Sequence, residues 1–308
     1  MSDMSAPSTM AITGAGRGKL PRHIAKKLKK QKIKSLKGIV ESEGAEAAEE
    51  LREVAYPYPV DGNDHCESPL AAYEDISPIL DIIAAKLGKS RTQLRIYDPY
   101  YCEGAMKTHL LALGFKDVYN EKEDFYKVIE AKACPEYDVL VTNPPYSNDH
   151  VPKLLEFVRG QAPTKPFFLL MPNWVYTKDY YRCMTDRTSM FYLSPSNERY
   201  TYTTPKGRRQ KKSAKYTSPF PSLWYCGLGC ERSPTPKEQG EMQTKISQVG
   251  RVHLAMDVSQ LPLSVAHEND PRKRKARDIE KRRKNKRKKK GGSQGDEDEK
   301  QKKPRKVE

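Results

Sequence analysis

The sequence lacks any apolar run long enough to cross a bilayer. Its longest is Phe167 to Met171, whereas a membrane-spanning helix needs about 20 apolar residues. The first residues also lack the apolar stretch of a secretory signal peptide. We therefore expect an intracellular protein with no membrane partner.

Paired cysteines are also missing. The six cysteines show no Cys-x-x-Cys spacing, which argues against a zinc ribbon or a disulfide framework. Cys226 and Cys230 could share a metal with His65, but reduced, partly buried thiols are the preferred interpretation, and no metal site is predicted. The other cysteines are Cys66, Cys102, Cys134 and Cys183.

Acidic residues are scarce at the start of the chain and are outnumbered by cations at both ends. Residues 1–40 carry ten Lys or Arg and one acid, and residues 271–308 carry nineteen and seven. The formal net charge is +16, so residues 41–270 are mildly acidic. Both ends have too few apolar residues to offset the entropy of ordering. We therefore predict a basic, mostly disordered arm over 1–50 and a disordered basic and acidic tail over 271–308.

The basic clusters at 272–275 and 286–290 favour particular partners and a particular location. Such runs are typical of nuclear targeting and of binding to phosphate backbones. We expect nuclear or nucleolar localisation and a nucleic-acid partner. A tail that only keeps the protein soluble is the alternative, and salt-dependent binding separates the two.

Residues 138–146 carry the most informative motif. The apolar run Val139–Val141 predicts a buried strand, and the turn that follows is made rigid by two prolines. In an open α/β sheet, ligands bind at the carboxyl ends of the strands. A planar amine could donate there to the Asn143 side-chain oxygen and the Pro144 carbonyl, while Tyr146 stacks on its ring.

Asn143, Pro144, Pro145 and Tyr146 resemble the Asn-Pro-Pro-Tyr signature of class I S-adenosylmethionine-dependent methyltransferases that modify planar amino groups, the adenine-N6 enzymes above all. A plain surface turn is the alternative. The resemblance implies a Rossmann-like α/β domain over 60–230, with a mostly parallel central sheet and a late antiparallel hairpin. It also implies S-adenosyl-L-methionine as cofactor. Residues 231–270 are an uncertain extension in which 249–256 could add a strand.

The resemblance also suggests where the cofactor binds. A predicted strand over 94–98 leads through a turn into a helix at 106–113, and related enzymes pass the cofactor along an Asp-Pro-x-x-Gly-x-Gly turn. Cys102 and Ala105 stand where extra glycines are often found, so the match is degenerate. The matching residues are Asp98, Pro99 and Gly104, with Tyr100 between them, and Ser68 precedes the predicted helix 70–88.

The second predicted strand, 116–120, ends in an acidic cluster. In nucleoside-binding α/β folds, an acid at this point accepts hydrogen bonds from ribose hydroxyls. Glu121 is the candidate and Asn120 its substitute. Asp124 or Phe125 could instead flank the adenine ring.

Two later features indicate how an acceptor is held. Trp174 follows the buried strand 165–171 and could wall a base pocket, although an interior packing role is the preferred interpretation. Late strands are predicted at 190–193, 200–203 and 222–228. The last two flank a loop, 206–215, with six cations and no acid, which indicates a phosphate-bearing substrate unless the loop is only a solvated hairpin tip. Its candidate residues are Lys206, Arg208, Arg209, Lys211 and Lys212.

The preferred hypothesis is an adenine-N6 methyltransferase that acts on nucleic acid, RNA rather than DNA. RNA is favoured because a single-stranded base is easier to unstack and because no DNA-reading helix or zinc finger is recognisable. The same fold could instead methylate a protein glutamine or lysine, or guanine-N2. A third hypothesis is an inactive, methyltransferase-like scaffold that binds RNA.

Overall fold

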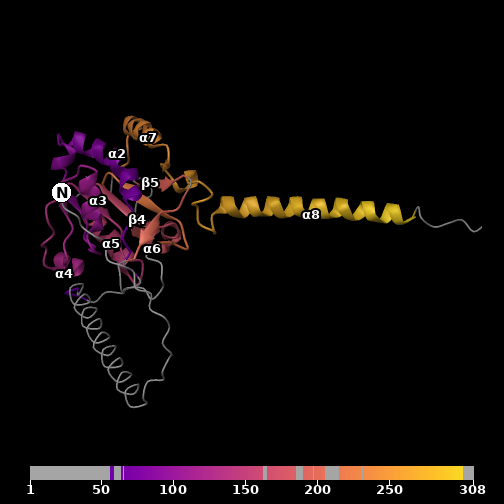
Figure 1. The fold of residues 1–308 in the computed structure, drawn as a ribbon, viewed down its shortest axis with the longest axis horizontal. Helices are drawn as coiled ribbons and strands as arrows, with labels where there is room; N and C mark the ends of the chain where they lie inside the picture. Colours follow the sequence, from indigo (N-terminus) through magenta and orange to yellow (C-terminus); the bar gives the residue numbers. More distant parts are fainter. Residues whose placement is uncertain are drawn as a thin grey trace, which may run out of the picture. The chain divides into compact units, whose positions relative to one another are not determined.

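The computed structural model describes residues 56–58, 64, 66–161, 165–184, 190–196, 198–204, 215–229 and 232–300 (Figure 1). The arm predicted over 1–50 and the candidate loop residues Lys206, Arg208, Arg209, Lys211 and Lys212 lie outside these ranges.

A mixed seven-stranded sheet forms the centre of the described structure, in the order β2-β1-β3-β4-β8-β5-β9. β1, β2, β3 and β4 pair in parallel, β8 is antiparallel to both β4 and β5, and β9 is antiparallel to β5. The predicted Rossmann-like α/β class, with antiparallel strands late in the chain, is confirmed. The strands are β1 Ile96–Tyr97, β2 Val118–Tyr119, β3 Val139–Thr142, β4 Phe167–Pro172, β5 Met190–Pro195, β8 Ser222–Gly227 and β9 Val252–Ala255.

Helices cover both faces of this sheet (Figure 1). Alternate strand residues point to opposite faces, so Phe168 and Leu170 join one buried cluster with α2, α3 and α7. Leu169 and Met171 join a second cluster with α4, α5 and α6. The helices are α2 Leu70–Lys86, α3 Ala105–Ala112, α4 Phe125–Glu130, α5 His150–Arg159, α6 Asp179–Met184, α7 Pro236–Val249 and α8 Pro271–Lys300, with 3-10 helices η1 Arg91–Gln93, η2 Val175–Thr177 and η4 Val258–Gln260.

The strand predicted at 200–203 is not part of the central sheet. Thr201–Thr203 forms β6, which pairs with β7, Lys215–Thr217, in a separate two-stranded sheet. Tyr202 is buried while Thr201 and Thr203 are exposed, so only one face of β6 is covered. Central strands such as β4 and β8 are buried along their whole length, as strands with covered faces require.

The uncertain extension 231–270 belongs to the domain. Thr235 caps α7, and Met242 and Ile246 bury their side chains in the α2 cluster. β9 then adds an edge strand beside β5. The extension therefore completes one layer and one edge of the fold.

Within the tail predicted to be disordered over 271–308, residues 271–300 form the helix α8. Low hydropathy predicts only that a segment cannot build a core, whereas Lys, Arg and Glu are good helix formers. The helix starts with Pro271 in its first turn, a favoured position, and the Asp270 carboxylate accepts from the Arg272 N–H at 2.9 Å. Among the described helices, none is long and apolar enough to span a membrane.

Candidate active site

The Asn143–Tyr146 turn lies at the carboxyl end of β3. All four β3 residues are buried, and β3 pairs in parallel with β1 on one side and β4 on the other. The three strands therefore end at the same edge of the sheet, where open α/β folds bind ligands.

Two cavities meet at Asn143. The larger, of about 780 Å³, is lined by Asn143 and Pro145 of the turn, by Pro99 and Tyr100 after β1, and by a further set of residues. The smaller, of about 20 Å³, is lined by Asn143 together with Ser68, Asp98, Gly104 and Asn120. The corner predicted to face a ligand therefore does face into a cavity. The larger cavity is also lined by Tyr58, Asp64, Cys66, Tyr101, Cys102, Glu123, Asp124, Phe125, Tyr126, Ser147, Asn148, Asp149, His150 and Lys153.

The Tyr146 side chain has a different place from the one predicted. Its hydroxyl lies 2.5 Å from Asn143 Oδ1 and 3.1 Å from the Leu170 carbonyl oxygen, and it donates toward both. Its ring meets Phe220 edge-on, with centroids 5.9 Å apart. The Tyr146 hydroxyl thus restrains the Asn143 amide, and the Tyr146 ring does not line the large cavity.

Asp98 is a buried carboxyl group in the wall of the small cavity. Its Oδ1 accepts from Thr142 Oγ1 at 2.5 Å and from the Tyr100 N–H at 3.0 Å. Burial raises the pKa of Asp98 to about 7, although both hydrogen bonds favour the ionised form. A cation bound in this cavity would favour the charged carboxylate.

Asn120 supplies an acceptor to the same wall. Its Nδ2 donates to the Asp98 carbonyl oxygen at 3.2 Å. Its Oδ1 is buried and has no hydrogen-bond partner among the described residues. Such an orphaned acceptor is costly unless a ligand supplies a donor, so the wall fits a ligand with hydroxyl or ammonium groups.

Glu121, the preferred ribose candidate, lies elsewhere. Its side chain is half-exposed and pairs with Lys107 at 2.7 Å, and it lines neither cavity. The acids of this segment that do line the large cavity are Glu123 and Asp124. The sequence predicted that this acidic cluster lies near the ligand, but which acid lines the cavity depends on how the chain turns after β2.

The amino terminus of α3 is closed by a residue that sequence analysis missed. Glu67 Oε1 accepts from the backbone N–H of Glu103 at 2.6 Å and of Ala105 at 3.5 Å, a favourable place for a carboxylate. Gly104 takes φ +78°, and a Cβ there would lie 3.4 Å from the Tyr101 ring. The predicted glycine position is thus explained by backbone geometry, while Glu67 occupies the helix end.

The large cavity also has an aromatic wall, which includes Phe125, the candidate for flanking an adenine ring, and Tyr100. Tyr100 meets Phe125 edge-on at 5.1 Å, and the Tyr126 hydroxyl hydrogen-bonds to His150 Nδ1. Burial raises the pKa of Tyr58 to about 12, so this phenol stays neutral. The signal in the sequence was the density of aromatic residues at 97–101 and 125–126.

Trp174 does not line either cavity. Its ring packs edge-on against Phe220 at 6.4 Å, and Lys178 lies over it at 5.3 Å. Phe220 also contacts Tyr146. Trp174 therefore supports the turn from a layer behind it.

No family model matches the sequence, and no curated protein matches it. Among solved structures, the chain is similar to a putative class I S-adenosylmethionine-dependent methyltransferase from Listeria monocytogenes, with a TM-score of 0.29 and 14% identity, over 59% of this chain and 71% of that one. It is also similar to TrmN from Thermus thermophilus, with a TM-score of 0.24 and 15% identity, over 49% of this chain and 48% of that one. The chain thus spans about half the length of TrmN.

Proposed function

We propose that this protein is an S-adenosylmethionine-dependent N-methyltransferase that acts on the exocyclic amine of adenine in nucleic acid, with RNA preferred over DNA. The observation that carries the proposal is the place of Asn143. Its side chain lies at the junction of a small polar cavity and a large aromatic one, where a donor and an acceptor could meet.

The residues around the small cavity could contact part of the donor. That cavity, at about 20 Å³, has room for little more than one water, so the body of the donor would lie in the large cavity of about 780 Å³. S-adenosylmethionine, when bound, supplies a methyl group on a positively charged sulfonium. Asp98 offers a carboxylate for a cationic ligand, and Asn120 Oδ1 offers a free buried acceptor. Ser68 and Gly104 complete this wall, and Pro99 and Tyr100 continue it into the large cavity.

The turn fits the acceptor. Asn143 lines both cavities and its side-chain oxygen can accept one hydrogen of an aromatic amine, whereas Pro144 is buried and lines neither cavity. For the Pro144 carbonyl to accept the second hydrogen, and so draw the nitrogen lone pair out of the ring and toward the methyl group, the turn has to open toward the acceptor. Tyr146 fixes the Asn143 amide by its hydroxyl. Alignment in a dry pocket is the main requirement of such an in-line displacement.

Charge favours nucleic acid as the acceptor molecule. The chain carries a formal net charge of +16, concentrated at its two ends, and cations there can neutralise phosphates. We extend the proposal to nuclear localisation on the same basis. The tail clusters at 272–275 and 286–290 support it.

A protein acceptor is the second candidate. Four carboxylate residues line the large cavity, namely Asp64, Glu123, Asp124 and Asp149. An acidic lining favours a cationic side chain such as lysine over a polyanion. Guanine-N2 and protein glutamine are further acceptors with suitable amine or amide groups.

Asn143→Ala tests the proposal. We expect methyl transfer to fall by on the order of 10² to 10³, because the activating acceptor is gone, while cofactor affinity stays within a few-fold. Purified protein is incubated with labelled S-adenosylmethionine and total RNA, DNA or protein, and the products are resolved by nucleoside and peptide mass analysis. Calorimetry measures cofactor binding.

Gln243→Ala, at an exposed position of α7, is the matched control and should behave as the wild type. An Asn143→Ala protein that retains full activity overturns the mechanism. A wild-type protein that binds no S-adenosylmethionine overturns the assignment as a methyltransferase and favours the inactive scaffold.

A further inference from the structure

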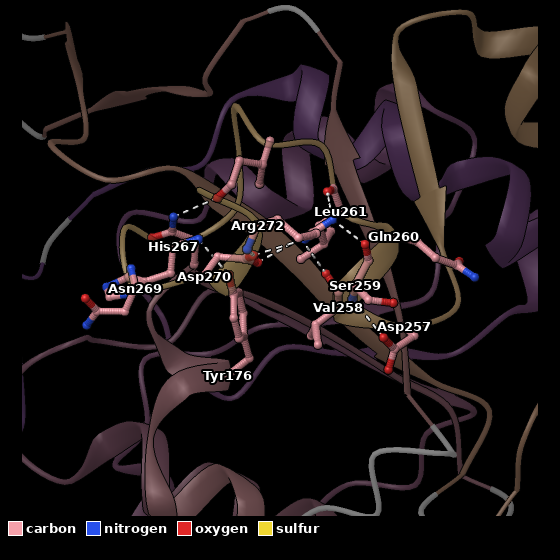
Figure 2. A network of polar contacts seen from close by, with 12 residues as sticks. Tyr176, Asp257, Val258, Ser259, Gln260, Leu261, His267, Asn269, Asp270 and Arg272 are labelled. Atoms are coloured by element: carbon pink, nitrogen blue, oxygen red, sulfur yellow. Dashed lines mark hydrogen bonds and ion pairs between the residues drawn. The ribbon is translucent and has the colours of Figure 1, made fainter. Parts of the chain in front are cut away.

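The basic helix α8 makes most of its bonds to the domain through Arg272, while Lys273 and Arg277 pair with Glu268 in the segment just before the helix. The Arg272 guanidinium donates to the carbonyl oxygens of Val258, Ser259 and Leu261 in and after η4. It also makes two bonds to the Asp270 carboxylate, from Nε at 3.0 Å and from Nη2 at 2.8 Å. Figure 2 shows these bonds converging on Arg272. Five hydrogen bonds on one side chain fix the first turn of the helix to the segment before it.

That segment is in turn attached to the ligand edge of the sheet. Asn173 Nδ2 donates to the Val265 carbonyl oxygen at 2.7 Å, and the His267 N–H donates to the Tyr176 hydroxyl at 2.6 Å. Asn173 directly follows β4 and Tyr176 lies in η2 just after it, and β4 pairs in parallel with β3. The first turn of α8 is therefore connected, through this segment, to the edge of the sheet at which Asn143 lies.

The exposed part of α8 has a large excess of positive charge. Residues 272–284 contain nine cations and two acids. Arg277 pairs with Glu268, but it stands four residues from Lys281, a spacing at which like charges repel on a helix. Glu280 forms an ion pair with Lys284 at 2.7 Å. Arg282 and Arg283 are exposed and make no ion pair within the described part of the chain. A polyanion would remove this repulsion.

The composition of α8 favours a phosphate backbone over a lipid surface as its binding partner. Between 272 and 284, Ile279 is the single large apolar residue, and it is 44% exposed. A helix that lies in a membrane interface needs a continuous apolar face. α8 has charge without such a face, so its chemistry fits phosphates in water.

We propose that α8 is a phosphate-binding arm for the RNA acceptor, anchored by Arg272 to the edge of the sheet that carries the active site. This inference rests on the proposed function. It assigns a positioning role to Arg272, which acts through α8, and a contact role to exposed cations such as Arg282 and Arg283.

The contact role is tested by binding alone, without cofactor. Fluorescence anisotropy of a labelled single-stranded RNA is measured across a salt series for the wild type, for Arg282→Gln/Arg283→Gln and for the control Lys237→Gln/Lys245→Gln. The control removes the same charge from exposed positions of α7. We expect the α8 variant to bind at least threefold more weakly and its log–log salt slope to decrease by ~1.4, at about 0.7 per lost phosphate contact. The control should match the wild type.

The positioning role is tested by turnover. Arg272→Gln removes the anchor, and Arg274→Gln removes the same charge from an exposed neighbour in the same turn. We expect Arg272→Gln to raise the KM for RNA at least threefold more than Arg274→Gln, with kcat and cofactor affinity unchanged. A thermal melt checks that both variants fold. If Arg272→Gln does not fold, the Arg282→Gln/Arg283→Gln variant is used to test the proposal.

The outcomes separate this inference from the proposed function. RNA methylation by the wild type with unchanged binding in the α8 variant overturns the arm and leaves the function intact. Loss of RNA binding in the α8 variant, with no methylation of RNA by the wild type, supports phosphate binding and overturns the function. Tighter binding to phosphatidylserine vesicles than to RNA overturns the choice of partner.

Discussion

At the scale of single residues, the site depends on how Asn143 is held. An asparagine amide can present either its oxygen or its nitrogen to a cavity. The Tyr146 hydroxyl, shared between Asn143 Oδ1 and the Leu170 carbonyl, identifies the oxygen as an acceptor and limits its rotation. The sequence predicted which residues form this corner, but it could not predict that Tyr146 turns toward Phe220, because Phe220 reaches it from a distant part of the chain.

Tyr146→Phe should therefore lower kcat by about tenfold, equivalent to about 1.4 kcal/mol in the activation free energy. The ring keeps its contact with Phe220 while the hydroxyl that orients Asn143 is lost. Single-turnover kinetics and calorimetry should show unchanged cofactor affinity. Tyr180→Phe, outside both cavities, is the control. An unchanged kcat in Tyr146→Phe would show that the amide is oriented by other contacts.

Asp98 gives the domain a defined pH dependence. Its pKa is about 7 in the folded protein and near its ordinary value of 3.8 when unfolded. Between these values the unfolded chain has released the proton while the folded protein keeps it, so Asp98 costs stability as pH rises through this window. Above about pH 7 the cost is constant.

Asp98→Asn removes this titration. The melting temperature of the variant minus that of the wild type should rise from about pH 4 to about pH 7 and then level off. Scanning calorimetry of the apo proteins measures both curves, and Asp117→Asn, at an exposed position, is the control. A difference that does not change with pH would mean that Asp98 is ionised throughout.

At the scale of elements, strongly patterned segments were predicted well. The helix predicted at 70–88 is α2, continuous through Pro78, and the strand predicted at 165–171 is β4, buried at every residue. The apolar patterns of both segments are local, although Pro78 leaves two short helices or a kink open as alternatives to one continuous helix. β6 was predicted as a strand but assigned to the central sheet, because a β-like pattern does not specify the sheet that a strand joins. The helix α8 was not predicted, because charge density does not specify whether a helix forms.

The contact between β4 and β8 makes a sharp test of packing. A Cβ at Gly227 would lie 2.4 Å from the Phe167 ring, so Gly227→Ala should lower the free energy of unfolding by about 1–3 kcal/mol. Gly240→Ala on α7 meets no atom within 4 Å and should be neutral or stabilising by up to about 1 kcal/mol. Urea denaturation compares the two variants. Equal stability of the two would mean that the Phe167 ring or the β4–β8 backbone shifts to make room for the added methyl group.

At the scale of the whole molecule, composition predicted a central domain with basic ends, but not the contacts that join these parts. A mildly acidic domain lies between two basic ends, and that much can be counted. The attachment of α8 through Asp270 and Arg272 to η4 could not be predicted, because it joins segments whose sequence shows no shared pattern. The same is true of Asn173 and Val265, which are 92 residues apart.

Glu67 is one more residue that joins distant segments. Its backbone pairs with Thr203 at 2.7 and 3.1 Å, while its carboxylate accepts from the backbone at the start of α3. One residue therefore links the β6–β7 ribbon to the helix that follows β1, so the position of the ribbon and the start of α3 are fixed together.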